Sequence, residues 1–172
     1  MVDLRCRVRR YSFDVRFARP HALDGVGRFL WSAAGALSQV LDADQERLSL
    51  LCHEDDVDRW QAQCTGVAGL VVHGTDLPIA SLAQHAAWPR WVVATEADVA
   101  HYAQYDLPPV PEGVAAVSTV YDFTPLDDPR YFRTKRGMKR LAAAALLASA
   151  SARSSHITTL SHSVAEQIVR RF

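Results

Sequence analysis

The stretch YSFDVRFARPHALDGVGRFLWSAAGALSQVL, residues 11–41, decides the fold, because a strand pattern passes directly into a helix pattern within it. Apolar and polar residues alternate over residues 11–17, which is the period-two pattern of a half-buried strand. After Pro20, apolar residues recur every three or four positions over residues 22–41, and this spacing predicts an amphipathic helix. We therefore expect a strand followed by a helix at the start of the fold.

The same reasoning predicts further elements along the chain. Strands are expected at residues 48–52, 67–73, 91–95, 102–105, 114–123 and 157–160. Helices are expected at residues 54–60, 76–86, 127–150 and 163–172. Residues 107–113 contain three prolines and are expected to form an extended connector, because proline cannot continue a helix or a central strand.

Two architectures fit this order of elements. The leading prediction is an α+β protein, with a ferredoxin-like βαββαβ domain over residues 1–106 and a smaller C-terminal part over residues 107–172 that carries an arginine-rich helix. The alternative is an α/β doubly wound parallel sheet, which follows if strands and helices alternate strictly. Periodicity does not separate the two architectures.

Length and composition restrict the class of protein. A chain of 172 residues that is 49% hydrophobic fits one domain, or one domain with a small appendage, and is not disordered. The apolar runs are too short to span a membrane, and no apolar stretch of the kind found in a signal peptide follows the charged first residues. We therefore expect a cytoplasmic protein with no membrane partner. Cys6, Cys52 and Cys64 have no C-x-x-C spacing and are predicted to be reduced, packed thiols.

The charges are unevenly distributed although they sum to zero. Residues 1–20 carry six Arg against two Asp, and residues 129–172 carry nine Lys or Arg against Glu166 alone. Residues 21–128 carry four Arg against twelve Asp and four Glu. Two basic ends therefore bracket an acidic body, which indicates either a polyanionic partner or an acidic surface that meets a basic partner.

The cations near the C-terminus gather in the predicted helix that starts at Asp127-Asp128-Pro129. Its first turns present several of them on one face, which suits an RNA groove, where each neutralised phosphate releases a counterion. The alternative without a nucleic-acid partner is that these cations form a solvated face, which keeps an apolar helix soluble. The candidate RNA-binding residues are Arg130, Arg133, Lys135, Arg136, Lys139, Arg140 and Arg153.

Cleavage of RNA without a metal needs a base near the 2′-hydroxyl, an acid for the leaving oxygen and a group that stabilises the charged phosphorane. His21, between the first strand and the first helix, is a candidate base, although a histidine there is more often a cap or a surface residue. The spacing of His156 and His162 does not fit a helical metal pair. With no carboxylate cluster and no Gly-x-Gly-x-x-Gly or P-loop, we expect neither metal nor cofactor, and a nucleotide-dependent enzyme is disfavoured.

Four segments follow one another in a distinctive order. They are Leu70-Val-Val-His-Gly74 with Trp88, Leu107-Pro-Pro-Val-Pro-Glu-Gly113, Arg133-Thr-Lys-Arg-Gly-Met-Lys-Arg-Leu141, and Thr159-Leu-Ser-His-Ser163 with Gln167. Together they resemble the CRISPR repeat-processing endoribonucleases, especially those of the I-F subtype. The resemblance implies a ferredoxin-like domain, an arginine-rich helix that grips the repeat stem-loop, and a catalytic histidine. It points to His21 and Ser161 as the catalytic positions.

The leading hypothesis is therefore a metal-independent endoribonuclease. It binds the stem-loop of CRISPR repeat RNA, cleaves it by 2′-hydroxyl attack to mature guide RNA, and stays bound in an effector complex with other subunits. One alternative is a non-catalytic interaction protein, a complex subunit or an inhibitor, whose acidic body meets a basic partner. Another is a small doubly wound enzyme with a site at the strand ends near His53 and His73.

Overall fold

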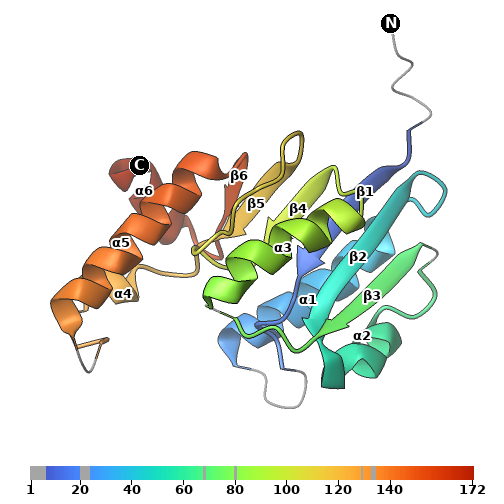
Figure 1. The fold of residues 1–172 in the computed structure, drawn as a ribbon, viewed down its shortest axis with the longest axis horizontal. Coiled ribbons are helices and arrows are strands. Elements are labelled where there is room, and N and C mark those ends of the chain that lie inside the picture. Colours follow the sequence, from blue (N-terminus) through green and yellow to red (C-terminus); the bar gives the residue numbers. More distant parts are fainter. Residues whose placement is uncertain (1–6, 20–23, 68, 80, 129, 133–134) are drawn as a thin grey trace, which may run out of the picture.

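The computed structural model describes residues 7–19, 24–67, 69–79, 81–128, 130–132 and 135–172. In this part of the chain six strands form one sheet, in the order β3-β2-β1-β4-β5-β6. Their bounds are β1 Arg9–Asp14, β2 Glu46–His53, β3 Leu70–Thr75, β4 Val99–Tyr102, β5 Ala115–Thr119 and β6 His156–Thr158. Each neighbouring pair is parallel, so the carboxyl ends of all six strands lie at one edge, here called the carboxyl edge (Figure 1).

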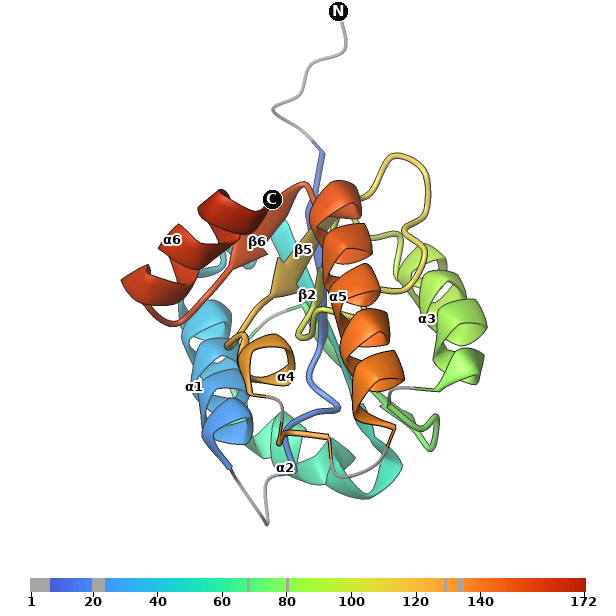
Figure 2. The same cartoon turned by 90° about the vertical axis from the view of Figure 1, so that its left-hand side faces the viewer.

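Helices cover both faces of this sheet. Their bounds are α1 Gly25–Val40, α2 Val57–Gln63, α3 Leu82–Ala94, α4 Thr124–Asp127, α5 Arg136–Arg153 and α6 His162–Arg171, with a short 3-10 turn, η1, at Glu54–Asp56. Helices α1 and α6 lie on one face, and α3 and α5 lie on the other (Figure 2). A parallel sheet needs such coverage, because its central strands are apolar on both sides.

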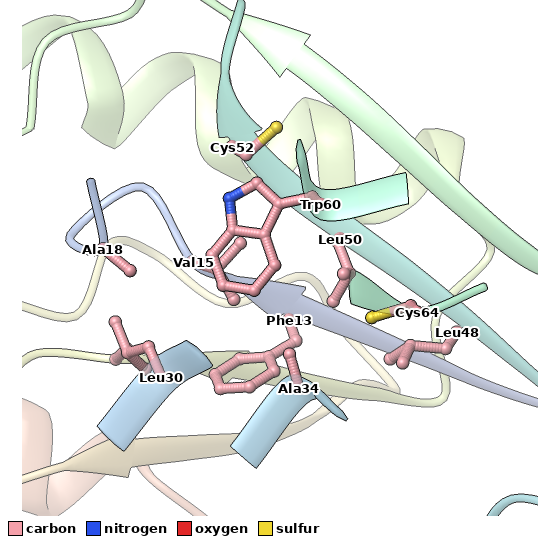
Figure 3. Packing of buried hydrophobic residues seen from close by; sticks show 11 residues of the cluster. Phe13, Val15, Ala18, Leu30, Ala34, Leu48, Leu50, Cys52, Trp60 and Cys64 are labelled. Carbon is pink, nitrogen blue, oxygen red and sulfur yellow. The ribbon is translucent and has the colours of Figure 1, made fainter. Parts of the chain in front are cut away.

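The largest core cluster lies between the sheet and the α1 layer. Figure 3 shows side chains of β1 and β2 converging on Trp60 of α2, which is fully buried. Phe13 and Leu50 are also buried there, as is Leu30 of α1. Burying a side chain of this size contributes about 1.5–3 kcal/mol. Cys52 and Cys64 are free, buried thiols in the same cluster, which agrees with the prediction of packed thiols. Cys6 lies outside the described residues.

The leading prediction of a ferredoxin-like α+β fold is wrong, and the α/β doubly wound alternative describes the sheet. A ferredoxin-like domain contains antiparallel pairs, whereas β2 and β3 pair in parallel, Leu48 opposite Leu70. Parallel neighbours need a crossover, and residues 54–63 supply it as η1 and α2. After residue 106 the chain adds β5 and β6 to the same sheet.

Two predicted elements also change identity. Residues 91–95 end α3 instead of forming a strand, and the strand follows at Val99–Tyr102. Of the long helix expected at residues 127–150, α4 contains only Asp127, and α5 begins at Arg136, directly after Lys135 in the left-handed region at φ 49°. Helix α5 therefore begins nine residues after Asp127, where the acidic start signal lies.

Candidate ligand-binding site

The order of the strands marks one point on the carboxyl edge. From β1 the chain moves by way of α1 to β2 and then β3, whereas from β4 it moves the other way to β5 and β6. β1 and β4 are neighbours, with Tyr11 opposite Val99, so the connections leave in opposite directions at this pair. Open α/β sheets bind ligands outside the carboxyl ends of the strands at such a reversal. We therefore take the carboxyl edge beside β1 and β4 as the candidate site.

Helix α1 begins at this reversal with glycines. Asp24 caps it, and its Oδ1 accepts a hydrogen bond of 2.7 Å from the Gly27 amide. A Cβ placed on Gly25 would meet no atom within 4 Å, so a ligand can approach the backbone there. The first amides of a 16-residue helix carry the positive end of its dipole, which favours anions. The sequence signal was Gly25-Val-Gly27, but the third glycine of a dinucleotide motif is replaced by buried Leu30.

Tyr121, two residues after the end of β5, faces the first turns of the same helix. Its ring packs edge-on against Phe29, with the ring centroids 6.0 Å apart. The Tyr121 hydroxyl is buried and has no hydrogen-bond partner among the described residues. Burial raises the pKa of this hydroxyl, and the charge of Asp24 raises it further. An unsatisfied hydroxyl beside the α1 start is a group that a polar ligand would satisfy.

A buried ion pair fixes the end of β1. Arg16 donates from Nε to Asp14 Oδ1 at 2.9 Å and from Nη2 to Oδ2 at 2.6 Å, and both side chains are fully buried. The Arg16 Nη1 donates to the Leu77 carbonyl at 3.1 Å, which ties the loop after β3 to β1. Burial opposes the charged guanidinium, but the hydrogen bonds and charge of Asp14 outweigh it and raise the pKa of Arg16. Arg16 is therefore a structural cation of this edge.

A second polar pair fixes the loop after β4. Gln84, fully buried at the start of α3, donates from Nε2 to Asp106 Oδ2 at 3.0 Å. Burial raises the pKa of Asp106, while hydrogen bonds from Tyr102 and Gln84 lower it in part. The loops on both sides of the strand reversal are thus held by buried polar contacts, which pre-organises the edge.

An ion pair joins the loop after β1 to the loop after β2. Arg19 Nε lies 3.2 Å from an oxygen of buried Asp56. Burial, together with the charge of Arg19, lowers the pKa of His53 beside them, which keeps this histidine neutral near pH 7. His73 lies within β3, opposite Leu51, and its ring packs edge-on against Trp91. Of the two predicted histidines only His53 therefore stands at a strand end.

A surface hollow of about 550 Å³ opens at the carboxyl end of β5. Its volume lies within the range of small-molecule sites, roughly 300–1,000 Å³. Six of its eight lining residues have polar or charged side chains. The lining residues are Asp122, Phe123, Thr124, Asp127, Asp128, Arg130, Val164 and Gln167. Asp122, in the wall of this hollow, directly follows Tyr121, whose ring contacts Phe29 of α1.

The two predicted catalytic residues are not brought together by any described contact. His21 lies outside the described residues. Ser161 caps α6, and its Oγ accepts a hydrogen bond of 3.2 Å from the Val164 amide. Its hydroxyl oxygen therefore has a structural function in starting α6.

The predicted RNA-binding residues fall into three groups. Four of them are exposed at or before the start of α5 and form no ion pair among the described residues: Arg130, Lys135, Lys139 and Arg140. Arg133 lies outside the described residues, and the side chain of Arg136 is also outside them. Arg153, the last residue of α5, donates to the carbonyls of Leu107 and Ser149. Arg153 thus anchors the connector of residues 107–113.

His101 is a core residue whose ring contacts one aromatic and one polar side chain. Its ring stacks on Phe13 with the centroids 4.5 Å apart, and its Nε2 lies 2.7 Å from Thr119 Oγ1. Burial lowers the pKa of His101 to about 4, so the ring is neutral near pH 7. This histidine supports the sheet rather than the candidate site.

Within the described ranges, no group of three or more His, Cys, Asp or Glu side chains is arranged to hold a metal ion. None of the described helices combines the length and apolar character that crossing a membrane requires. In comparisons with known proteins, no protein-family model matches the chain, and no curated protein gives a significant match.

Proposed function

We propose that this chain binds a phosphate-bearing, hydroxyl-rich small molecule, of the class of sugar phosphates and nucleotides, at the carboxyl edge of its sheet. The observation that carries the proposal is the reversal of strand order between β1 and β4, with α1 beginning at that point. The absence of a complete glycine motif disfavours a dinucleotide but not this wider class, since the helix start itself supplies the donors.

The α1 start is suited to the phosphate. Amides of its first turn point out of the helix, and the open space at Gly25 admits an oxygen close to the backbone. Asp24 satisfies the Gly27 amide alone, which leaves other first-turn donors for a ligand. Phosphate binding by free backbone amides in the open space at Gly25 does not depend on a side-chain cation.

The hollow at the carboxyl end of β5 is suited to hydroxyl groups. Carboxylate and amide oxygens accept hydrogen bonds from hydroxyls, and Asp122, Asp128 and Gln167 contribute such oxygens to its wall. Phe123 adds an apolar surface in the same wall. A molecule with a phosphate at α1 and a sugar ring toward β5 would also place a polar group near the Tyr121 hydroxyl.

The test is an amide NMR titration with a nucleoside diphosphate, a sugar phosphate and inorganic phosphate in separate samples. We expect the first two to shift the amides of residues 24–28 and 122–128, and inorganic phosphate to shift only residues 24–28. Gly25→Glu should weaken binding at least about tenfold through charge repulsion, while an acid at this helix start stabilises α1 by about 0.3–1 kcal/mol. Binding and stability therefore move in opposite directions in this variant.

Ser32→Glu is the matched control, since it adds the same charge to an exposed position two turns further along α1. It should leave binding unchanged. Shifts confined to the opposite edge of the sheet, or none with any of the three compounds, would remove the proposal.

A second candidate, structured RNA of the CRISPR repeat type, is favoured by one observation. Arg130, Lys135, Lys139 and Arg140 are exposed at the start of α5 without ion-pair partners in the described part of the chain. A gel shift with the repeat hairpin tests binding, and Lys135→Gln with Arg140→Gln should reduce both its affinity and its salt dependence. Cleavage that persists in His21→Ala would exclude His21 as the base.

A further inference from the structure

Helices α3 and α5 lie on the same face of the sheet and form what we call the α3/α5 layer (Figure 2). Neither helix contains an Asp or a Glu. Their cations are Arg90 in α3 and Arg136, Lys139, Arg140 and Arg153 in α5. The two helices therefore carry five cations and no anion, although the chain as a whole has no net charge.

The outer side of α5 is apolar. Ala143, Leu147 and Ala150 form the stripe that packs on the sheet, and they are buried. Residues 141–152 contain no charged side chain, so the side turned away from the sheet carries Leu and Ala side chains, with Ser149 as its exposed polar residue. Leu141 is 76% exposed and Met138 is 65% exposed. A surface helix ordinarily carries polar residues on that side.

Helix α3 also exposes large apolar side chains. Leu82 at its start is 90% exposed and Val93 near its end is 61% exposed. Lys139 and Arg140 are exposed in the first turns of α5, close in sequence to Met138 and Leu141. The layer thus combines cations with large apolar side chains, and no acid within the two helices neutralises them.

The opposite layer differs in charge pattern. Helix α6 also exposes an apolar residue, Val169, but Glu166 and Arg170 form an ion pair of 3.0 Å beside it. Helix α1 exposes Arg28, Ser32 and Gln39 along its length, with one large apolar residue, Val40, at its end. Among the described side chains, cations that form no ion pair and several large exposed apolar residues thus occur together in the α3/α5 layer.

We propose that the α3/α5 layer binds the surface of an anionic lipid bilayer. Cations attract acidic headgroups, and exposed Leu, Met and Val side chains enter the boundary between headgroups and acyl chains. A nucleic acid would use the cations but leave Leu82, Met138 and Leu141 exposed to water.

Surface contact with a bilayer needs no membrane-spanning helix, so it is compatible with the described helices. It differs from the expectation, drawn from the sequence, that the protein has no membrane partner. It goes beyond the ligand proposed for the carboxyl edge and does not depend on it.

The first experiment measures cosedimentation of the full chain with phosphatidylcholine vesicles, with and without phosphatidylglycerol. We expect binding only to the anionic vesicles, weakened by salt. Lys139→Gln with Arg140→Gln should weaken it about thirtyfold, since each cation near an anionic surface contributes about a factor of five. The matched control, Arg28→Gln with Arg170→Gln, removes two exposed cations from the other face and should leave binding unchanged.

The second experiment separates the apolar contribution. Met138→Gln with Leu141→Gln should lower vesicle affinity about tenfold without changing its salt dependence. Val40→Gln with Val169→Gln, equally exposed on α1 and α6, should have no effect. Thermal melting confirms that each variant folds, because exposed substitutions change stability by only about 0.5 kcal/mol. The proposal is overturned if anionic vesicles are not bound, if either control pair matches its test pair, or if the layer binds an RNA hairpin and no vesicle.

Discussion

The two edges of the sheet differ in how far their ion pairs are exposed to solvent. At the carboxyl edge, Asp14 and Arg16 form an ion pair in which both side chains are fully buried. At the amino edge, Arg7 and Arg10 pair with Asp98 and Glu96, but the Arg7 side chain is 69% exposed and that of Glu96 is 71% exposed. Buried charges hold a single arrangement because breaking it leaves a charge without water, whereas exposed pairs are screened. The rigid edge is also the edge at which we place the ligand.

The largest expected difference between the edges comes from breaking one pair at each. Asp14→Ala strands the buried guanidinium of Arg16 and should lower the free energy of unfolding by about 3–5 kcal/mol. Arg7→Ala at the amino edge should lower it by less than about 1 kcal/mol. Urea unfolding measures both. The double variant Asp14→Leu with Arg16→Met should recover most of the loss, and equal losses at the two edges would refute the contrast.

The titration of His101 extends the comparison to the interior between the edges. Its pKa is about 4 in the folded protein, below the ordinary value of 6.5, so the unfolded chain binds the proton more readily. Its contribution is therefore complete above pH 6.5 and is lost as pH falls toward 4. We expect about 2 kcal/mol of this loss between roughly pH 7 and pH 5.

His101→Gln should flatten this pH dependence of the urea midpoint. A smaller slope of the same sign should remain, because the pKa values of His53 and His73 are also lowered by burial. An unchanged slope in the variant would show that His101 is not responsible.

A smaller effect is expected from the helix cap at the carboxyl edge. Ser161→Ala removes the oxygen that accepts from the Val164 amide and should lower stability by about 1 kcal/mol. Ser163→Ala, at the exposed second residue of α6, should change it by less than about 0.5 kcal/mol. Thermal unfolding distinguishes the two, and equal effects would contradict a capping function.

The smallest expected effect is a gain at the amino edge. Glu96 follows α3 with φ 50°, in the left-handed region where glycine is favoured. Glu96→Gly should therefore raise stability by up to about 1 kcal/mol, less the weak contribution of its pair with Arg10. Lys135→Gly, at φ 49° on the carboxyl side, is the parallel test. A loss at both positions would show that backbone strain is not the deciding factor.

The first strand and helix were predictable from the sequence, whereas the direction of strand pairing was not. Alternation over residues 11–17 and the helical spacing over residues 22–41 correspond to β1 and α1. Periodicity identifies a strand but not its neighbours, so the crossover through α2 was indistinguishable from a surface excursion. The apolar run of residues 91–95 was ambiguous for the same reason, since it suits a buried strand and the end of a buried helix equally.

The buried part of the candidate site was hidden by the strand pattern itself. Asp14 and Arg16 occupy the polar positions of the alternation, which predicts a solvent-facing side. Asp14 ends the central strand β1, where both faces of the sheet are covered, and Arg16 lies in the turn just beyond it; both are fully buried and pair with each other. The glycines in the first turn of α1 can be read from the sequence, but their importance depends on the strand reversal, which only the topology shows.

The central position of β1 also affects the order in which the chain folds during synthesis. One side of β1 pairs with β2, but the other pairs with β4, where Tyr11 meets Val99. At about 5–20 residues per second, ribosomes take roughly 4–20 s to make the intervening chain. During that interval β1 has an unpaired edge and an apolar face, so the nascent protein passes through a period in which it is open to association with other chains.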